Sequence, residues 1–323
     1  MKNLGLIIPL DYKLLSIAAI IDVFDTVNRI YADNHREIPI KINIIQSPEQ
    51  IKNDCSSFHG YPVISTSSNF VADTVLIPSF STSNLKDTIS KNHIYIPWIQ
   101  EQFKAGAEIA SFCTGAFLFG ATGLLNGKSA TTHVDVCNAL ATSFPSVLVK
   151  PDLTVTVDGR CYTSGGSTST FQLLILLVQK YCSNDIAIRI AKIFAIDMDR
   201  YTQSYFSTFR PNHTHNDDLV MRVQRKIETN YGDINTIDEV IKDLPASRRN
   251  IVRRFKKMTG IPPIEYLQQI RIETAKRQLE QSNQSISEII FDTGYTDPKS
   301  FRKTFHKLVG MKPAEYRVKF KVK

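Results

Sequence analysis

The chain of 323 residues is 42% hydrophobic and 22% charged, an ordinary globular composition that excludes a disordered or collagen-like protein. It is too long for one domain of usual size, and its longest wholly apolar run, residues 173–178, is far below the roughly 20 residues of a membrane span. Residues 209–323 carry 23 Lys and Arg against 14 Asp and Glu, a net +9, whereas residues 1–208 carry 16 against 17. The sequence therefore predicts two domains, the second basic enough to suggest a polyanionic partner.

The cysteines and the first residues predict a cytoplasmic protein. An odd, scattered set without CxxC spacing is typical of a reducing compartment, and it predicts neither a disulfide framework nor a zinc site. The set is Cys55, Cys113, Cys137, Cys161 and Cys182. The apolar run 4–10 is broken at once by polar residues 11–13, so we expect a strand there and no signal peptide.

The first domain alternates short β-rich segments with helical ones. The expected strands are apolar and rich in Ile and Val, or end in turn residues, and they span residues 4–9, 40–46, 74–78 and 108–112. The expected helices span residues 16–32, 94–105, 117–125, 169–182 and, in one or two pieces, 185–207. This alternation predicts an α/β domain over residues 1–208, with a mostly parallel sheet covered by helices on both faces.

A polar stretch with one proline, residues 209–217, is expected to be a linker in which His213 and His215 are solvated. The remaining domain, residues 218–323, is predicted to be all-helical. It contains an internal repeat, because FKKMTGIPPIEY (255–266) and FHKLVGMKPAEY (305–316) match at a period of 50 residues.

Each repeat unit has the pattern of a helix-turn-helix. A capping box, with Glu at the third position after the cap, is expected to open the first helix of each unit at Thr236 and Ser285. Ser247 and Asp297 are expected to cap the second helices. Two capped helices joined by a tight turn make a helix-turn-helix, and a continuous helix over about 263–281 joins the two units.

The alternative is a helical bundle that arose by duplication alone. The outer faces of the second helices argue against it, because their basic residues recur at helical spacing instead of at random. These residues are Arg249, Arg253 and Lys256 in the first unit, and Lys299, Arg302, Lys303 and His306 in the second.

The C-terminal domain resembles the AraC/XylS family of bacterial transcription regulators over about residues 218–317. The resemblance rests on ISEIIFDTGYTDPKSFRKTFHKLVGMKPAEYR (286–317) and on the helix core YLQQIR (266–271). It departs from the family at Ile290, where alanine is usual, and in the first turn, residues 243–246, which lacks the usual glycine. The resemblance implies that the second helix of each unit enters the major groove of double-stranded DNA.

Within that resemblance, the base-reading positions fall at Arg249, Val252, Arg253, Lys299, Arg302 and Lys303. Phosphate contacts are expected from Lys256, Lys257 and Lys307. The predicted surface is completed by Arg248, Asn250, Ser300 and His306. A joining helix of about 19 residues is roughly 28 Å long and would hold the two reading helices near one duplex turn apart, on two adjacent sub-sites.

The first domain has one distinctive segment, FCTGAFLFGATGLLNGKSATTHV (112–134). A strand over 108–112, Cys113 on a tight turn before Gly115, and then a helix form a nucleophile-elbow arrangement. Such a turn presents the thiol at a helix N-terminus, where the helix dipole is expected to favour the thiolate.

Over about residues 2–205 the chain resembles the PfpI-like branch of the class I glutamine-amidotransferase superfamily, which implies a flavodoxin-like sheet. An enzyme of this type would use Cys113 as nucleophile and His133 as base. Three departures argue for a degenerate site: Ser16 where such enzymes often keep a glutamate, Thr114 where many hydrolases have histidine, and Ser79-Phe80 in place of a glycine pair.

The sequence thus predicts a cytoplasmic, sequence-specific transcription regulator without cofactor or metal, whose first domain senses a small metabolite or mediates dimerisation. The alternatives are a Cys113-dependent hydrolase and a redox sensor fused to a DNA-binding domain. The expected partners are duplex DNA, a small-molecule effector and a second copy of the chain, with RNA polymerase as a further candidate and no membrane. The candidate pocket residues are Ser16, Cys113, Thr114, Gly115 and His133.

Overall fold

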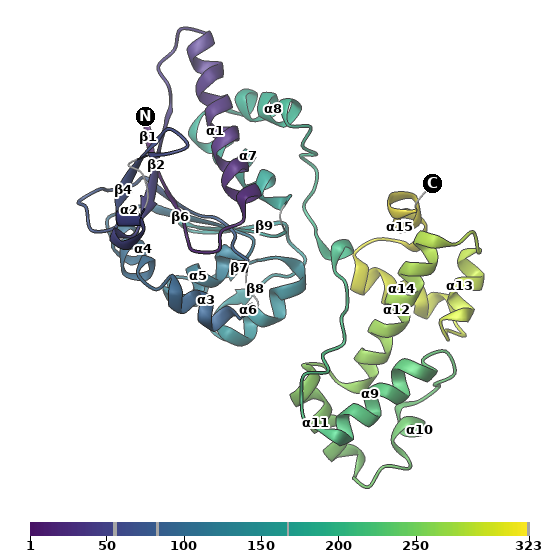
Figure 1. Cartoon of the computed structure of the whole chain (residues 1–323). Coiled ribbons are helices and arrows are strands. Elements are labelled where there is room, and N and C mark those ends of the chain that lie inside the picture. The colour runs from purple at the N-terminus through teal and green to yellow at the C-terminus, as the bar shows by residue number, and fades with distance from the viewer. Residues whose placement is uncertain (54–56, 82–83, 167, 322–323) are drawn as a thin grey trace. The chain divides into compact units, whose positions relative to one another are not determined.

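The computed structural model describes residues 1–53, 57–81, 84–166 and 168–321, so Cys55 lies outside the described residues. The chain divides into two compact units, Met1–Gln203 and Ser204–Lys323 (Figure 1). The division falls at 203/204 instead of the expected 208/209, because Tyr205 packs in the core of the second unit. None of the helices formed by the described residues is long and apolar enough to cross a membrane.

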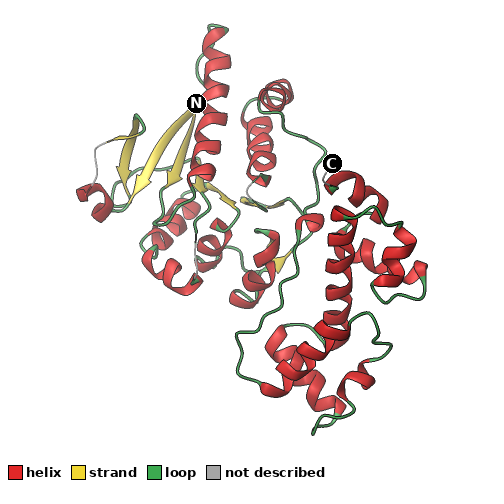
Figure 2. Ribbon diagram, turned by 45° about the vertical axis from the view of Figure 1, so that its right-hand side comes forward, coloured by secondary structure: helices red, strands yellow, loops and turns green. Residues whose placement is uncertain are grey.

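The first unit is built on an eight-stranded sheet (Figure 2). In spatial order the strands are β3 (Ser57–Phe58), β4 (Tyr61–Ser65), β2 (Ile40–Gln46), β1 (Lys2–Ile7), β5 (Thr74–Ile77), β6 (Glu108–Phe112), β10 (Cys161–Ser164) and β9 (Val155–Asp158). The strands from β4 to β10 are parallel, and only the two outer pairs, β3–β4 and β10–β9, are antiparallel. A separate parallel pair is formed by β7 (Ser129–Ala130) and β8 (Leu148–Val149). The order β2-β1-β5-β6-β10 is the flavodoxin-like order, which confirms the predicted fold class.

Helices cover both faces of this sheet, because successive strand residues point to opposite sides. Leu76 packs in the core formed with α1 (Leu14–Asp33), α7 (Ser169–Tyr181) and α8 (Asn184–Ile193). Its neighbours Val75 and Ile77 pack in the other core, whose helices are α3 (Leu85–Lys91), α4 (Tyr95–Lys104), α5 (Gly115–Ala121) and α6 (Cys137–Ser143). The short elements α2 (Pro48–Asn53) and η1 (Val134–Val136) complete the unit.

The second unit is helical, as predicted. Its elements are η2 (Ser204–Phe206), α9 (Asp218–Asn230), α10 (Ile237–Ile241), α11 (Arg248–Thr259), α12 (Pro263–Gln281), α13 (Ile286–Asp292), α14 (Pro298–Val309) and α15 (Pro313–Phe320). They form two cores, one around Ile251 and Phe255 of α11 and one around Phe301 and Phe305 of α14. Helix α12 belongs to both, with Leu267 in the first core and Ala275 in the second, so one rigid element joins the two helix-turn-helix units.

Helix termini follow the sequence signals with one exception. Ser247 and Asp297 cap α11 and α14, and both helices end at left-handed glycines, Gly260 and Gly310. Ser285 and its Glu288 form the predicted reciprocal capping box. The expected box at Thr236 is incomplete. Thr236 accepts the N–H of Glu239, but the Glu239 carboxylate accepts the N–H of Asn235 instead of that of Thr236.

The expected linker, residues 209–217, packs within the second unit. The ring of Phe209 lies edge-on to Tyr266, with centroids 5.2 Å apart. His213 is exposed and contacts Glu228 at 3.0 Å, whereas His215 is half-buried and hydrogen-bonds Gln224 at 2.8 Å. The expectation that both histidines are merely solvated is therefore wrong for His215.

Candidate nucleic-acid interface and ligand pocket

The outer face of α11 presents a set of exposed basic side chains: Arg248, Arg249, Arg253, Lys256 and Lys257. Together with the half-buried Val252 they line a hollow in the surface. Two neighbours orient this set, since Arg248 pairs with Asp238 at 3.2 Å and Arg253 donates to Asn250 Oδ1 at 3.4 Å. The helix can therefore offer donors to base edges and phosphates once it lies in a groove.

The equivalent face of α14 is also exposed and basic. Its predicted contact residues, all exposed, are Lys299, Ser300, Arg302, Lys303, His306 and Lys307. Asp297 accepts the backbone N–H groups of Lys299 and Ser300 at 3.0 and 2.9 Å, so those amides are engaged in the cap and only the side chains remain for a partner.

Two tyrosines at matching positions of the repeat each bond a carboxylate on the helix that supports their helix-turn-helix unit. Tyr266 donates to Glu228 of α9, and Tyr316, its counterpart 50 residues later, donates to Glu280 of α12. Burial, followed by these carboxylates, raises the pKa of both phenols. The repeat therefore extends from sequence to tertiary contacts, and it presents the two basic helices from similar scaffolds.

The elbow of the first unit lies at the carboxyl end of β6. Cys113 has a left-handed backbone, with φ of 53°, and its N–H donates to Ser164 O at 3.0 Å. Position 115 requires glycine, because a Cβ there would lie only 2.5 Å from Ile77 O. The expected strand-turn-helix geometry is present.

The thiol at this elbow is shielded from solvent. Cys113 is fully buried, and burial raises the pKa of its thiol although Lys13 and hydrogen bonds with Thr114 act in the opposite direction. Desolvation of the charged sulfur therefore opposes the thiolate that the helix dipole was expected to favour, and the pKa is raised overall.

The amides facing the elbow already have partners. The N–H of Ser79 donates to Ser16 Oγ at 3.0 Å, and the N–H of Phe80 donates to Thr114 Oγ1 at 2.9 Å. Thr114 Oγ1 in turn donates to Phe80 O at 2.7 Å. Ser16 and Thr114, which stand where the resemblance leads us to expect glutamate and histidine, thus accept these two N–H groups.

A cavity of about 510 Å³ lies beside the elbow. Of the predicted pocket residues, Thr114 and His133 line it, whereas Ser16, Cys113 and Gly115 are buried and are not part of its lining. Its wall combines apolar, cationic and anionic side chains: Lys13, Phe80, Ser81, Leu85, Phe117, Asp135 and Val136. His133 Nδ1 accepts the N–H of Asp135 at 3.3 Å, which fixes the ring at the rim of η1. The cavity is large enough for a small metabolite.

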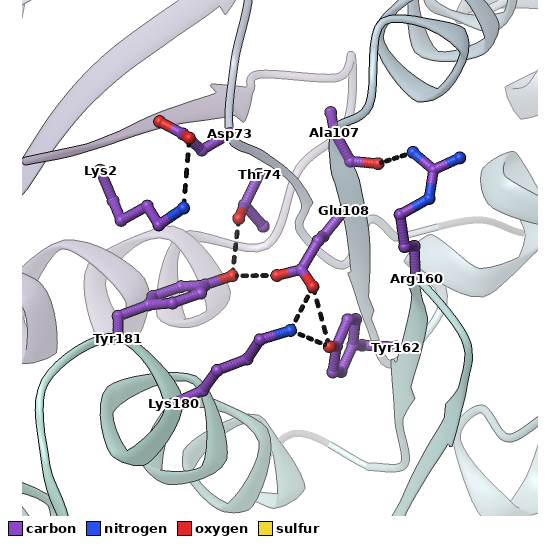
Figure 3. A network of polar contacts seen from close by, with 9 residues as sticks. All are labelled: Lys2, Asp73, Thr74, Ala107, Glu108, Arg160, Tyr162, Lys180 and Tyr181. Carbon is purple, nitrogen blue, oxygen red and sulfur yellow. Dashed lines mark hydrogen bonds and ion pairs between the residues drawn. The ribbon is translucent and has the colours of Figure 1, made fainter.

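A second cavity, about 710 Å³, lies at the amino ends of the central parallel strands, whereas the elbow lies at their carboxyl ends. Figure 3 shows Glu108 bound to Tyr162, Lys180 and Tyr181. Burial would raise the pKa of Glu108, but hydrogen bonds from Lys180 and Tyr181 lower it overall. Tyr181 also bonds Thr74 at 2.6 Å, so this network fastens the end of α7 to β5 and β6. The members of this network are far apart in the chain, so no sequence pattern indicates it.

The fold and these sites define a class: a flavodoxin-like α/β domain with a strand-to-helix elbow, followed by a double helix-turn-helix domain. Comparison with known families matches residues 64–180 to the DJ-1/PfpI family and residues 241–319 to a helix-turn-helix domain. The chain thus combines a DJ-1/PfpI domain with an AraC-type helix-turn-helix domain, as the two resemblances predicted.

Its curated relatives include HTH-type transcriptional regulators. The HTH-type transcriptional regulator GbdR of Pseudomonas aeruginosa is 23% identical over 234 residues, which are 72% of this chain and 63% of GbdR. The HTH-type transcriptional regulator GlxA of Rhizobium meliloti is 26% identical over 219 residues, 66% of each chain. The match to GbdR thus spans less than two thirds of that relative.

One solved structure supports the fold of the first unit. A crystal structure of a protein from Vibrio parahaemolyticus, described as a transcriptional regulator, superposes with a TM-score of 0.51 at 17% identity. It covers 59% of this chain and 98% of that one.

Proposed function

We propose that this protein is a sequence-specific, DNA-binding transcription regulator of the cytoplasm. The observation that carries the proposal is the pair of capped, outward-facing basic helices, α11 and α14, that the single helix α12 joins. Neither a duplicated bundle nor a solvated surface accounts for cations at matching positions such as Arg253 and Lys303, both exposed. With α12 about 28 Å long, one chain reads two adjacent major-groove sub-sites.

In this proposal the first unit senses a small molecule and does not catalyse a reaction. Three observations support sensing: the thiol of Cys113 is buried, which raises its pKa, the amides of Ser79 and Phe80 are engaged, and the cavity lined by Thr114 and His133 is open to a ligand. The relatives named above are regulators, which favours the same conclusion.

The assembly we propose is a homodimer formed through the first unit. Closed two-fold dimers are the commonest assembly of soluble homo-oligomers, and the near-neutral charge of residues 1–208 does not oppose self-association. RNA polymerase is the further partner that an activator of this kind would contact.

The proposal is tested by selecting duplexes that bind the full chain from a random pool and sequencing them. We expect one enriched site composed of two half-sites, one for each protomer of the dimer. Each half-site should contain two conserved blocks about one helical turn of DNA apart. A titration of the enriched duplex against a scrambled one then measures specificity. Equal affinity for both duplexes at physiological salt would contradict sequence-specific regulation.

A further inference from the structure

Gln203, the last residue of the first unit, holds three loops together with one side chain, at residues 131–132, Pro151 and Gly166. Its Nε2 lies within hydrogen-bond distance of Thr131 Oγ1, at 3.1 Å, and of the carbonyl oxygens of Thr132 and Pro151, both at 3.0 Å. Its Oε1 accepts the N–H of Gly166 at 3.2 Å. The residue is only 1% exposed, so this amide is a buried and fully used polar group.

Two of these loops, at residues 131–132 and at Gly166, lead directly to the elbow and the cavity beside it. Thr132 Oγ1 donates to Cys113 O at 2.7 Å, and the next residue, His133, lines the cavity. A Cβ on Gly166 would lie 3.4 Å from the His133 ring, so that glycine also packs against the pocket wall. Gln203 therefore touches the backbone that positions the pocket without lining the pocket itself.

Gln203 is also the residue at which the chain leaves the first unit, and the segment 204–207 that follows it belongs to the second unit. Its N–H donates to Asp152 O at 2.9 Å, which fixes it to the first unit. Within the next few residues the chain is fixed to the second unit, because Tyr205 lies in its core and Lys276 of α12 donates to Ser207 O. Gln203, which is fixed beside the pocket, and Ser207, which is fixed to α12, are thus only four residues apart in the chain.

We propose that Gln203 is a positioning residue that latches this segment to the pocket wall. A ligand that moves Thr132 and His133 would move Gln203, and with it the segment that contacts α12. The inference rests on the proposed function, since it assigns the route by which the sensing pocket reaches the DNA-binding unit.

Gly165 provides a second means of disturbing the same contact. A Cβ built there would overlap the amide of Gln203, and the Gly165 backbone is outside the left-handed region. Gly165→Ala should therefore displace the Gln203 side chain without changing residue 203. In Gln203→Ala/Gly165→Ala the new methyl group has space, so the double variant should behave like the single ones.

The first experiment is hydrogen exchange on the full chain, read by mass spectrometry on peptides that contain residues 129–133 and 164–166. We expect Gln203→Ala and Gly165→Ala each to speed exchange there about tenfold, with no further increase in the double variant. The matched control is Gln102→Ala, which removes another buried glutamine that bridges Ala72 N and Phe70 O, each at 2.8 Å. Unchanged exchange in both single variants, additive effects, or the same change in Gln102→Ala would overturn the latch.

The second experiment adds the duplex selected above. Because coupling between two sites is reciprocal, DNA bound to the second unit should change exchange at residues 129–133 in the wild type. In Gln203→Ala that change should vanish while affinity for the duplex stays within about threefold. No change in the wild type, or the same change in both proteins, would overturn the transmission. If no duplex is enriched, the proposed function fails, while the first experiment still decides the latch.

Discussion

Arg254 and Asp217 form a two-point ion pair that orients α11. Arg254 Nε donates to Asp217 Oδ2 at 2.9 Å, and Nη2 donates to Oδ1 at 2.8 Å. Asp217 simultaneously caps α9 by accepting the N–H of Val220 at 3.1 Å. Arg254 is thus the basic residue of α11 that faces the protein while its neighbour Arg253 faces solvent, and the segment before α9 is tied to the helix that we propose reads DNA.

The first prediction concerns this pair. Asp217→Ala removes the helix cap and leaves Arg254 without its carboxylate, so the second unit should lose about 1–2 kcal/mol of stability. Urea unfolding followed by hydrogen exchange in α9 and α11 measures the loss. Asp218→Ala, which changes the exposed neighbour, is the control, and equal losses in both variants would contradict the role of the pair.

The second prediction is the pH dependence of the same contact. Hydrogen bonds from Arg254, opposed by burial, lower the pKa of Asp217 in the folded chain. A depressed folded pKa stabilises the protein above the unfolded value of about 3.9, and the contribution is lost as pH falls through the folded pKa. Between pH 7 and pH 3 the wild type should therefore lose more stability than Asp217→Ala. Parallel stability curves for the two proteins would reject this assignment.

The third prediction addresses base reading. Arg253→Ala and Lys303→Ala should each weaken binding to the selected duplex by about 1–3 kcal/mol and relax preference at one sub-site. Arg222→Ala removes an exposed cation of α9 and is the control. Equal weakening on selected and scrambled duplexes would show that Arg253 and Lys303 contact phosphates only.

The fourth prediction separates phosphate contacts from base contacts. Lys257 is exposed near the end of α11, and Lys257→Ala should lower the slope of log K against log salt by about one unit without changing sequence preference. Titrations at several salt concentrations measure it. An unchanged slope with an altered site preference would mean that Lys257 reads a base.

The sequence was sufficient for the architecture of both units because their signals are local. Hydrophobic runs identified β1, β2, β5 and β6, and caps and glycines identified α11 and α14. Strand β10 was missed because it has only four residues and two of them, Thr163 and Ser164, are polar although fully buried. Thr163, which is fully buried there, is satisfied by Thr156 at 2.6 Å, a contact that hydropathy cannot indicate. The network of Glu108 was missed for a different reason, because its partners are far apart in the chain and become neighbours only when the sheet forms.

The site residues also fall into those that a local sequence signal predicts and those that depend on tertiary contacts. Exposed positions on α11 and α14 follow from helical period, which a sequence contains. The state of Cys113 does not, because its burial and the engagement of Ser79 and Phe80 depend on side chains from three separate segments. The inward turn of Arg254 likewise required the position of Asp217.

The last prediction tests whether the elbow retains thiol chemistry. Since burial raises the pKa of Cys113 in the folded chain, its thiolate fraction at pH 8 is lower than in the unfolded chain. Iodoacetamide should therefore alkylate Cys113 at least about tenfold more slowly in the native protein than in urea, as mapped by mass spectrometry.

Cys113→Ala should keep its affinity for the selected duplex, because the reading helices lie in the other unit. Rapid native alkylation of Cys113, together with turnover of an amide or aldehyde substrate that Cys113→Ala abolishes, would establish the hydrolase alternative. Loss of duplex binding on peroxide treatment in the wild type but not in Cys113→Ala would establish the redox sensor instead.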